Sequence, residues 1–214
     1  MRALREPGTP SVRAVPYATE DVYVARRSAL AVPAPPSLFE ILRMTGIDFF
    51  EVPPLRRRQP STSFAERGRS RLRVDLLAPS RGVDYPTVPV PELHAHAKGL
   101  PYLAYLLGAS QTIAALSSYG VVSVRVPVPE RFAAHKLITS QLRGKASGQA
   151  GKDLNQAATL IEALAERFPG AVDDALRAIP KSARRYLIRA VQALKLHLPS
   201  DAEVAWESLA RARQ

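Results

Sequence analysis

The sequence predicts a mixed α/β fold followed by a helical C-terminal part, and three observations lead to this fold class. Before residue 128, several segments alternate apolar and polar residues with period two, which is typical of half-buried strands. From Glu130 onward the apolar period changes to 3.6, which predicts helices. The 214 residues are enough for one sizeable domain or a compact pair. We therefore predict an α/β core over residues 1–128 and a helical region over residues 129–214.

The α/β core is predicted to contain four strands and one short helix. Residues 1–17 are rich in proline and arginine and show no clear period, and they begin the chain without an apolar signal-peptide segment. In the first strand Val22 and Val24 alternate with polar residues and are expected to face the core. Strands are predicted over 20–26, 47–52, 69–79 and 119–129, and a helix with Ser37 as N-cap and Gly46 at its end over 37–46.

The helical region is predicted to contain four helices. Their ranges are 130–143, 152–168, 182–198 and 201 to the end, with Asp201 as the N-cap of the last. The apolar stripe of the second helix is expected to reach Phe168. In its first turn, Asp153 would complement the helix dipole. On the third helix, Lys181, Arg185 and Arg189 follow one another at four-residue spacing on the face away from the core.

The composition restricts the function classes. Thirty Lys and Arg against nineteen Asp and Glu give a net charge of +11, which favours polyanions such as RNA or nucleotide phosphates, although a GC-rich genome alone also gives arginine-rich chains. The absence of cysteine excludes disulfides and zinc–thiolate sites. No apolar run approaches the length of a membrane span, so we predict a cytoplasmic protein that binds no membrane.

Two carboxylates are the candidate metal ligands. Asp21 and Asp75 each lie on a predicted strand between apolar residues, so both should point away from the core. Converging carboxylates can hold Mg²⁺, which prefers oxygen ligands and often shares them with phosphates. An ion pair is the simpler alternative, and Arg73 would be the partner of Asp75 on the same strand face.

Four segments together resemble a known superfamily. "TEDVYV" (19–24), "RLRVDLLAP" (71–79) and "VRVPVPERFAAHKL" with the later "KDLNQAATLI" resemble bacterial nucleotidyltransferase-fold proteins of the DNA polymerase beta-like superfamily. The helical blocks are also similar to those of abortive-infection toxin nucleotidyltransferases. The resemblance implies a small mixed sheet, a helical part that closes over a nucleotide, and transfer of a nucleoside monophosphate from an NTP with Mg²⁺ or Mn²⁺. The acceptor would be RNA, a protein hydroxyl or a small molecule.

By this resemblance, Asp21 and Asp75 match the first and third of the three metal-binding carboxylates. Tyr23 stands where the second carboxylate is expected, and a phenol is a poor Mg²⁺ ligand at pH 7. Gly8 and Thr9 match the phosphate-binding turn before the first strand, with prolines on both sides. A chain that begins downstream of the usual superfamily start would explain the same features.

Also by resemblance, Lys136, Arg143 and Lys152 are candidates for contacting the triphosphate or an RNA backbone. Lys136 and Arg143 are seven residues apart, which places them on one face of a helix. Lys152 would open the next helix, where an N-terminus also attracts anions. Two other functions stay open, namely a catalytically impaired module that binds a nucleotide or RNA, and a toxin–antitoxin component that binds an acidic protein.

Overall fold

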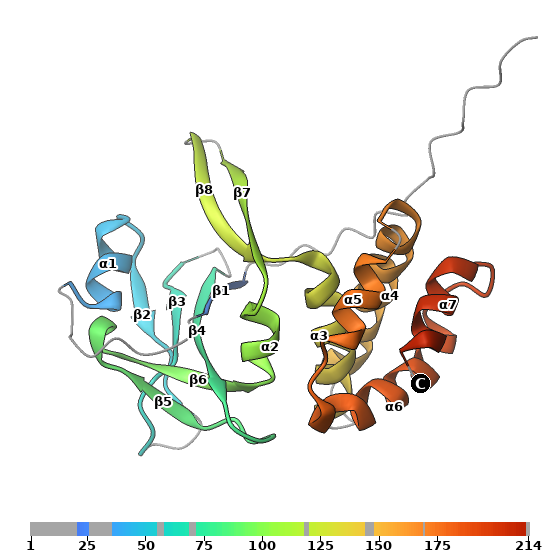
Figure 1. The fold of residues 1–214 in the computed structure, drawn as a ribbon. Helices are drawn as coiled ribbons and strands as arrows, with labels where there is room; N and C mark the ends of the chain where they lie inside the picture. Colours follow the sequence, from blue (N-terminus) through green and yellow to red (C-terminus); the bar gives the residue numbers. More distant parts are fainter. Residues whose placement is uncertain are drawn as a thin grey trace, which may run out of the picture.

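In the computed structural model, a mixed β-sheet and a group of helices lie side by side, and a long β-hairpin projects from between them (Figure 1). The larger sheet has the order β2-β3-β4-β6-β5, with β1 pairing with β4 outside this path. The second sheet is the hairpin β7–β8. The structure describes residues 21–25, 36–54, 58–68, 72–117, 120–143, 148–168 and 170–212.

The elements alternate in the first half of the chain and are all helical after residue 128. The strands are β1 (Asp21–Ala25), β2 (Phe49–Glu51), β3 (Ser63–Glu66), β4 (Arg73–Ser80), β5 (Thr87–Val90), β6 (Ala95–Pro101), β7 (Ser110–Ser117) and β8 (Gly120–Pro127). The α-helices are α1 (Leu38–Met44), α2 (Leu103–Leu107), α3 (Pro129–Leu142), α4 (Gly148–Arg167), α5 (Ala171–Arg177), α6 (Arg184–Ala193) and α7 (Glu203–Arg211), with 3-10 turns η1 (Pro91–Leu93), η2 (Lys181–Ala183) and η3 (Leu194–Leu196). The predicted fold class is confirmed.

The centre of the larger sheet is β4, which pairs with three strands. It runs antiparallel to β3 and parallel to β1 and β6. One face of β4 presents Val74, Leu76 and Ala78 to a buried apolar cluster that also contains Leu38 of α1. The start of α1 is fixed by a capping box in which Ser37 and Glu40 satisfy each other's backbone N–H groups, as the predicted N-cap requires. The opposite face of β4 carries Arg73 and Asp75 and is only partly covered.

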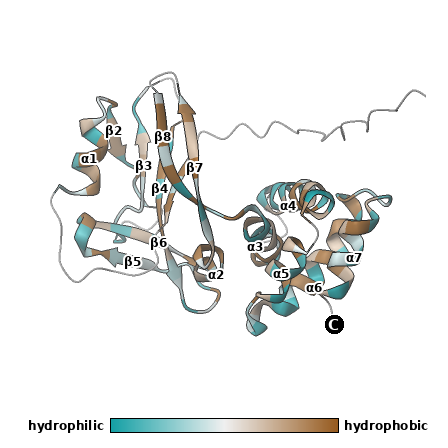
Figure 2. Cartoon of the chain, turned by 45° about the horizontal axis from the view of Figure 1, so that its top comes forward, coloured by the Kyte–Doolittle hydropathy of each residue, from teal (hydrophilic) through white to brown (hydrophobic). Residues whose placement is uncertain are grey.

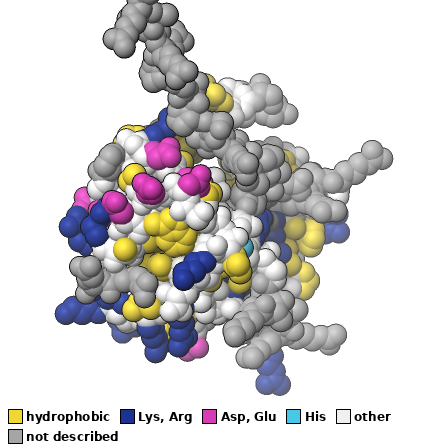
Figure 3. Space-filling view, turned by 90° about the vertical axis from the view of Figure 1, so that its right-hand side faces the viewer, with side chains coloured by type: hydrophobic (Ala, Val, Ile, Leu, Met, Phe, Trp, Pro, Cys, Tyr) yellow, Lys and Arg dark blue, Asp and Glu magenta, His cyan; other side chains and the backbone are white. Residues whose placement is uncertain are grey.

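A second apolar cluster holds the helices together. Its buried residues come from α3 to α7, and Tyr105 of α2 also belongs to it. The predicted stripe of the third helix is confirmed, since Leu187, Ala190 and Leu194 are all buried. Figure 2 shows that these helices turn their apolar faces toward one another. On the outer side of the helices, acidic side chains gather in the upper part and basic side chains along the lower edge (Figure 3). The predicted boundary between residues 128 and 129 stays a prediction.

Hydrogen bonds join α2 to the helices on either side of it. The Tyr105 hydroxyl donates to Ala175 O at 2.7 Å, and Arg131 donates to Tyr105 O at 2.9 Å. The Arg131 guanidinium also lies 5.2 Å from the Tyr105 ring centroid. A Cβ on Gly108 would lie 2.2 Å from an Arg131 nitrogen, so this position has room only for glycine while Arg131 keeps its place.

Several sequence expectations are wrong in detail. Val22 and Val24 are 47% and 39% exposed, because β1 packs mainly against the edge of β4 and no described helix covers it. Phe168 is 59% exposed, because α4 ends at Arg167 and the chain turns away from the apolar stripe there. The N-cap of α7 is Ala202, not Asp201. The sequence patterns also missed β3, β5, β6 and β7, which are short or lack clear alternation, together with α2 and α5.

The hairpin β7–β8 is open on both sides. Leu116 and Val121 face each other across the strands, and they are 79% and 67% exposed. Figure 1 shows the hairpin projecting above the rest of the fold. In the part of the chain that the structure describes, no helix is both long enough and apolar enough to cross a lipid bilayer.

Candidate functional site

Asp75 lies on the open face of β4, and two neighbours bind its carboxylate. Arg73 Nε donates to Asp75 Oδ1 at 3.0 Å, and the Ser63 hydroxyl donates to the same oxygen. Arg73 also donates to Ser63 Oγ at 2.9 Å, which closes a three-residue network. The ion pair predicted between Arg73 and Asp75 is confirmed. Ser63 was missed, because β3 is too short for its alternation to be recognised.

The register of β1 against β4 places the other candidate residues beside Asp75. Tyr23 is the Cα partner of Asp75, and Asp21 is the partner of Arg73. Neighbours in register on adjacent strands point to the same face of a sheet, so the Tyr23 phenol lies on the face of the Asp75 carboxylate. Tyr23 is 57% exposed. Tyr23, which stands where the resemblance leads us to expect a second carboxylate, therefore lies directly beside Asp75.

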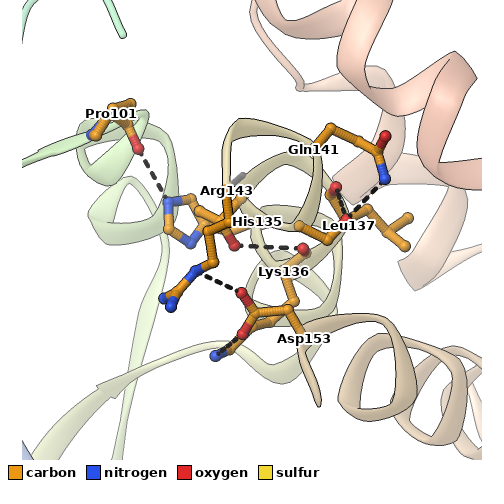
Figure 4. Close-up of polar contacts among 9 residues, drawn as sticks. Pro101, His135, Lys136, Leu137, Gln141, Arg143 and Asp153 are labelled. Carbon is orange, nitrogen blue, oxygen red and sulfur yellow. Dashed lines mark hydrogen bonds and ion pairs between the residues drawn. The ribbon is translucent and has the colours of Figure 1, made fainter. Parts of the chain in front are cut away.

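A second cluster, the Lys136–Asp153–Arg143 triad, joins α3 to α4. Lys136 Nζ donates to Asp153 Oδ1 at 2.7 Å, and Arg143 Nε lies 2.9 Å from Asp153 Oδ2. Figure 4 shows the two cationic side chains reaching Asp153 from α3 and from the residue that ends it. The carboxylate is almost completely buried, whereas the Lys136 and Arg143 side chains are 20% and 37% exposed.

The structure corrects the sequence-based explanation of Asp153. We expected this residue and Lys152 to open a helix, but α4 begins at Gly148, so both lie further along it. Asp153 therefore does not complement the dipole at a helix start. It is buried as the shared anion of two cations, because a buried carboxylate needs ion-pair or hydrogen-bond partners. Lys152 is half-buried, and no described residue forms an ion pair with it.

The triad has an excess of one positive charge. One carboxylate balances one of the two cations, so the group as a whole still attracts an anion. Both cations remain partly open to solvent and have further N–H donors. Because Asp153 holds the two side chains, less conformational entropy would be lost when they bind a phosphate.

Lys98 on β6 contacts Tyr85 in the loop after β4, and neither residue was singled out from the sequence. Lys98 Nζ lies 5.6 Å from the Tyr85 ring centroid. Burial raises the pKa of Tyr85, and the positive charge of Arg143 acts in the opposite direction. Lys98 pairs with Leu77, two residues after Asp75 on β4. The loop that carries Tyr85 is thus in contact with the sheet at Lys98.

His135 has a structural position instead of a catalytic one. It is 3% exposed, and its Nε2 lies 3.1 Å from Pro101 O at the end of β6 (Figure 4). Burial lowers its pKa to about 4, so the ring is neutral at pH 7 and Nε2–H donates to the carbonyl. This bond ties α3 to the sheet.

The comparison with protein families decides the affiliation of the chain. A family model described as nucleotidyltransferase matches residues 10–180. The chain belongs to the nucleotidyltransferase family. No curated protein and no solved structure gives a significant match. The matched range contains β1, β4 and the triad, so Asp21, Asp75 and the cations of α3 and α4 lie inside the family region, whereas Gly8 and Thr9 lie just before it.

Membership in the nucleotidyltransferase family implies nucleotide binding and nucleotidyl transfer in general. The bacterial origin and the likeness to toxins stay predictions. Within this family member, the described residues form two polar centres, one around Asp75 and one around Asp153. No hydrogen bond or ion pair between described residues joins the two centres directly.

The structure of this nucleotidyltransferase brings some of the predicted site residues together and leaves others apart. The structure brings Lys136 and Arg143 together and places the β1 strand of Asp21 beside Asp75. It leaves Lys152 apart from the triad's ion pairs. The side chain of Asp21 is not described, and Gly8 and Thr9 lie outside the described residues. The functional roles of all seven residues stay predictions.

The predicted metal site at Asp21 and Asp75 stays a prediction. Among the side chains that the structure describes, no three His, Cys, Asp or Glu residues form a group that could hold a metal ion. Asp75 alone supplies a carboxylate on the open face, and Mg²⁺ in nucleotide enzymes is often held by one or two carboxylates together with substrate phosphates. The donor type therefore fits Mg²⁺, provided that Asp21 joins Asp75.

Proposed function

We propose that this chain transfers a nucleoside monophosphate from an NTP to an acceptor hydroxyl. In this reaction the acceptor oxygen forms a bond to the α-phosphorus, the bond to the pyrophosphate oxygen breaks, and the hydroxyl proton passes to water. The observation that carries the proposal is the family match over β1, β4 and the triad, together with the Asp75 carboxylate on the partly covered face of β4, whose side chain is 19% exposed. The acceptor is RNA, a protein hydroxyl or a small molecule.

Lys136, Arg143 and Lys152 would bind the triphosphate and stabilise the negative charge that develops on the leaving pyrophosphate. The excess positive charge of the triad and its partial exposure support this role. Asp153 would act as a positioning residue, because it touches the two cations and is itself closed to solvent. Gly8 and Thr9 would add backbone N–H donors for a phosphate.

Asp21 and Asp75 would hold Mg²⁺ or Mn²⁺, which would screen the charge of the triphosphate. Arg73 and Ser63 would keep the Asp75 carboxylate in place on the strand. Tyr23 weakens the site, because its neutral phenol occupies the strand position in register with Asp75.

A second function is favoured by this same position of Tyr23. A chain with two carboxylates, one of them already bound by Arg73 and Ser63, would bind a nucleotide or RNA without turnover. The toxin-like resemblance adds a further possibility of an acidic protein partner. A stable complex with such a protein, in place of nucleotide binding, would support that reading.

Label transfer from each α-³²P NTP, with Mg²⁺ or Mn²⁺, separates these functions. Total RNA and the protein itself are offered as acceptors, and Asp75→Asn is the matched variant because it keeps the size of the side chain and one acceptor oxygen but removes the negative charge. Transfer that disappears in Asp75→Asn establishes the enzyme. If wild type and Tyr23→Asp both fail to transfer label but still bind NTP, the impaired binding module is the correct function.

A further inference from the structure

The outer side of α6 carries an unusual concentration of positive charge. From Ala175 to Ser200 the sequence contains no Asp or Glu. Six exposed cations lie on this stretch, and Arg177 among them pairs with Asp174. We name the other five, which lie on η2, α6 and η3, the α6 basic surface: Lys181, Arg184, Arg185, Arg189 and Lys195. Within the described part of the chain, none of the five forms an ion pair with a carboxylate. Most solvated helix faces mix both signs of charge, so this surface differs from an ordinary one.

Three of these cations are arranged in a row. Lys181 in η2 and Arg185 and Arg189 in α6 follow one another at four-residue spacing, so they form a row of about 12 Å at a helical rise of about 1.5 Å per residue. Basic side chains are visible along the lower edge of the helical part in Figure 3, at the height where Figure 1 places α6. A row of unpaired cations fits a polyanion with regularly spaced charges.

One of these cations is held in place by an aromatic ring. The Arg185 guanidinium lies 4.7 Å from the Tyr186 ring centroid, and its Nη2 donates to the Tyr186 hydroxyl at 2.7 Å. Tyr186 is buried in the helical cluster, so it is a fixed support. The remaining guanidinium N–H groups are free to bind a phosphate, and the loss of side-chain entropy would be small.

A groove opens beside this row of cations. Its volume is about 780 Å³, and it reaches from Gly82 and Val83 after β4, past Tyr102 and Ala104, to Lys181 and Arg185. Tyr102 forms a fixed wall, because its hydroxyl donates to Ser182 O at 3.3 Å and its ring packs edge-on against Tyr186 at 6.2 Å. A mostly apolar groove next to a row of cations suits an unpaired base and its backbone phosphates.

The groove also leads toward the candidate site. Gly82 and Val83 belong to the same loop as Tyr85, which is influenced by the charge of Arg143. This loop directly follows β4, the strand that carries Asp75. A chain lying on the α6 basic surface could therefore extend along this loop toward Tyr85 and Lys98.

We propose that the α6 basic surface and its groove bind single-stranded nucleic acid, with backbone phosphates on the cations and a base in the groove. We further propose that the bound strand is the acceptor, and this second part rests on the proposed nucleotidyl transfer. Phosphate contacts carry no sequence information, so binding depends on salt and little on sequence. A duplex could contact the cations but could not place a base in the groove.

The binding part is tested without NTP or metal, in EDTA, so that it does not depend on catalysis. Fluorescence anisotropy measures the Kd for labelled RNA and DNA single strands of about 20 nucleotides over a range of salt concentrations. The triple variant Lys181→Gln, Arg185→Gln and Arg189→Gln should weaken binding about tenfold and reduce the salt slope by about 2, at about 0.7 per lost phosphate contact. The RNA and DNA arms show which strand is preferred.

Matched controls remove the effect of net charge. Arg43→Gln, Arg58→Gln and Arg167→Gln together remove the same charge from exposed positions elsewhere, and they should leave Kd and slope nearly unchanged. Ala104→Glu tests the groove and should weaken binding more than Ala210→Glu, since both positions are exposed but only Ala104 lines the groove.

Three results would overturn the proposed nucleic-acid surface. The first is an equal loss of oligonucleotide affinity in the two triple variants, and the second is an equal loss of affinity in the two glutamate variants. The third is binding of polyglutamate as tight as that of the oligonucleotides, which would indicate an acidic protein partner. If the protein binds oligonucleotides but transfers no label, the acceptor role and the proposed activity are wrong, whereas nucleic-acid binding by the α6 basic surface still holds.

Discussion

Asp153 accepts a hydrogen bond from Lys136 at 2.7 Å, although the two residues are 17 positions apart on different helices. Arg143 approaches the other carboxylate oxygen at 2.9 Å, so one buried anion fixes the relative position of α3 and α4. The two helices pack along their length in the centre of the apolar cluster. This relationship makes the triad important for stability as well as a candidate phosphate site.

Asp153→Asn should lower the free energy of unfolding by about 3 kcal/mol, because two partly buried cations lose their shared anion. Urea denaturation followed by circular dichroism measures the change. Asp174→Asn is the control, since its ion pair with Arg177 is exposed and should contribute less than about 1 kcal/mol. Equal losses in both variants would mean that the triad does not stabilise the helix pair.

Lys136→Met should weaken NTP binding about tenfold, because a charge-assisted contact to phosphate is lost. Its effect on stability should be small, since Arg143 continues to neutralise Asp153. Isothermal titration with a non-hydrolysable NTP gives the Kd, and a thermal melt gives the Tm. Arg177→Met is the matched control. An unchanged Kd in Lys136→Met would remove the triad from the nucleotide site.

His135 should make stability depend on pH between about 4 and 6.5. Burial lowers its pKa from 6.5 to about 4, so the unfolded chain binds the proton first. The stabilisation is complete above pH 6.5 and decreases as the pH falls toward 4, by at most about 3 kcal/mol. Urea titrations at several pH values should show a steeper loss for wild type than for His135→Phe. Parallel curves would contradict this prediction.

Gly108→Ala should destabilise the protein by about 1 kcal/mol, because the new Cβ would displace the Arg131 guanidinium from Tyr105. The backbone at Gly108 is helical, so alanine adds no conformational strain. In an Arg131→Gln background the cost should largely disappear. A double-mutant cycle from thermal melts measures this coupling, and additive effects would exclude the clash with Arg131 as its cause.

The tip of the β7–β8 hairpin should limit solubility. Leu116 and Val121 form an exposed cross-strand pair on a sheet with open edges, which favours association with other chains. Leu116→Thr with Val121→Thr should raise the concentration at which light scattering begins and leave the Tm nearly unchanged. Ile188→Thr, an exposed apolar residue on α6, serves as the comparison. If light scattering begins at the same concentration in both variants, the hairpin is not the surface through which the chains associate.

The sequence by itself determined the elements whose pattern is long or closed by clear signals. Alternation predicted β4 and β8, the Ser37 cap and Gly46 delimited α1, and the 3.6 period predicted α3, α4 and α6. Even the ion pair of Arg73 with Asp75 followed from their two-residue spacing, because such residues share a strand face. These features depend on neighbours in the chain, which a sequence displays directly.

Only the tertiary structure decided the features that join distant segments. The pairing of β1 with β4 placed Tyr23 beside Asp75, and the packing of α3 on α4 buried Asp153 between two cations. The groove likewise needs the loop after β4 and the start of α6 to approach each other. The charge of a residue and the hydrophobic period of its segment cannot specify which polar side chain is buried in the fold, because burial depends on how the elements pack in space.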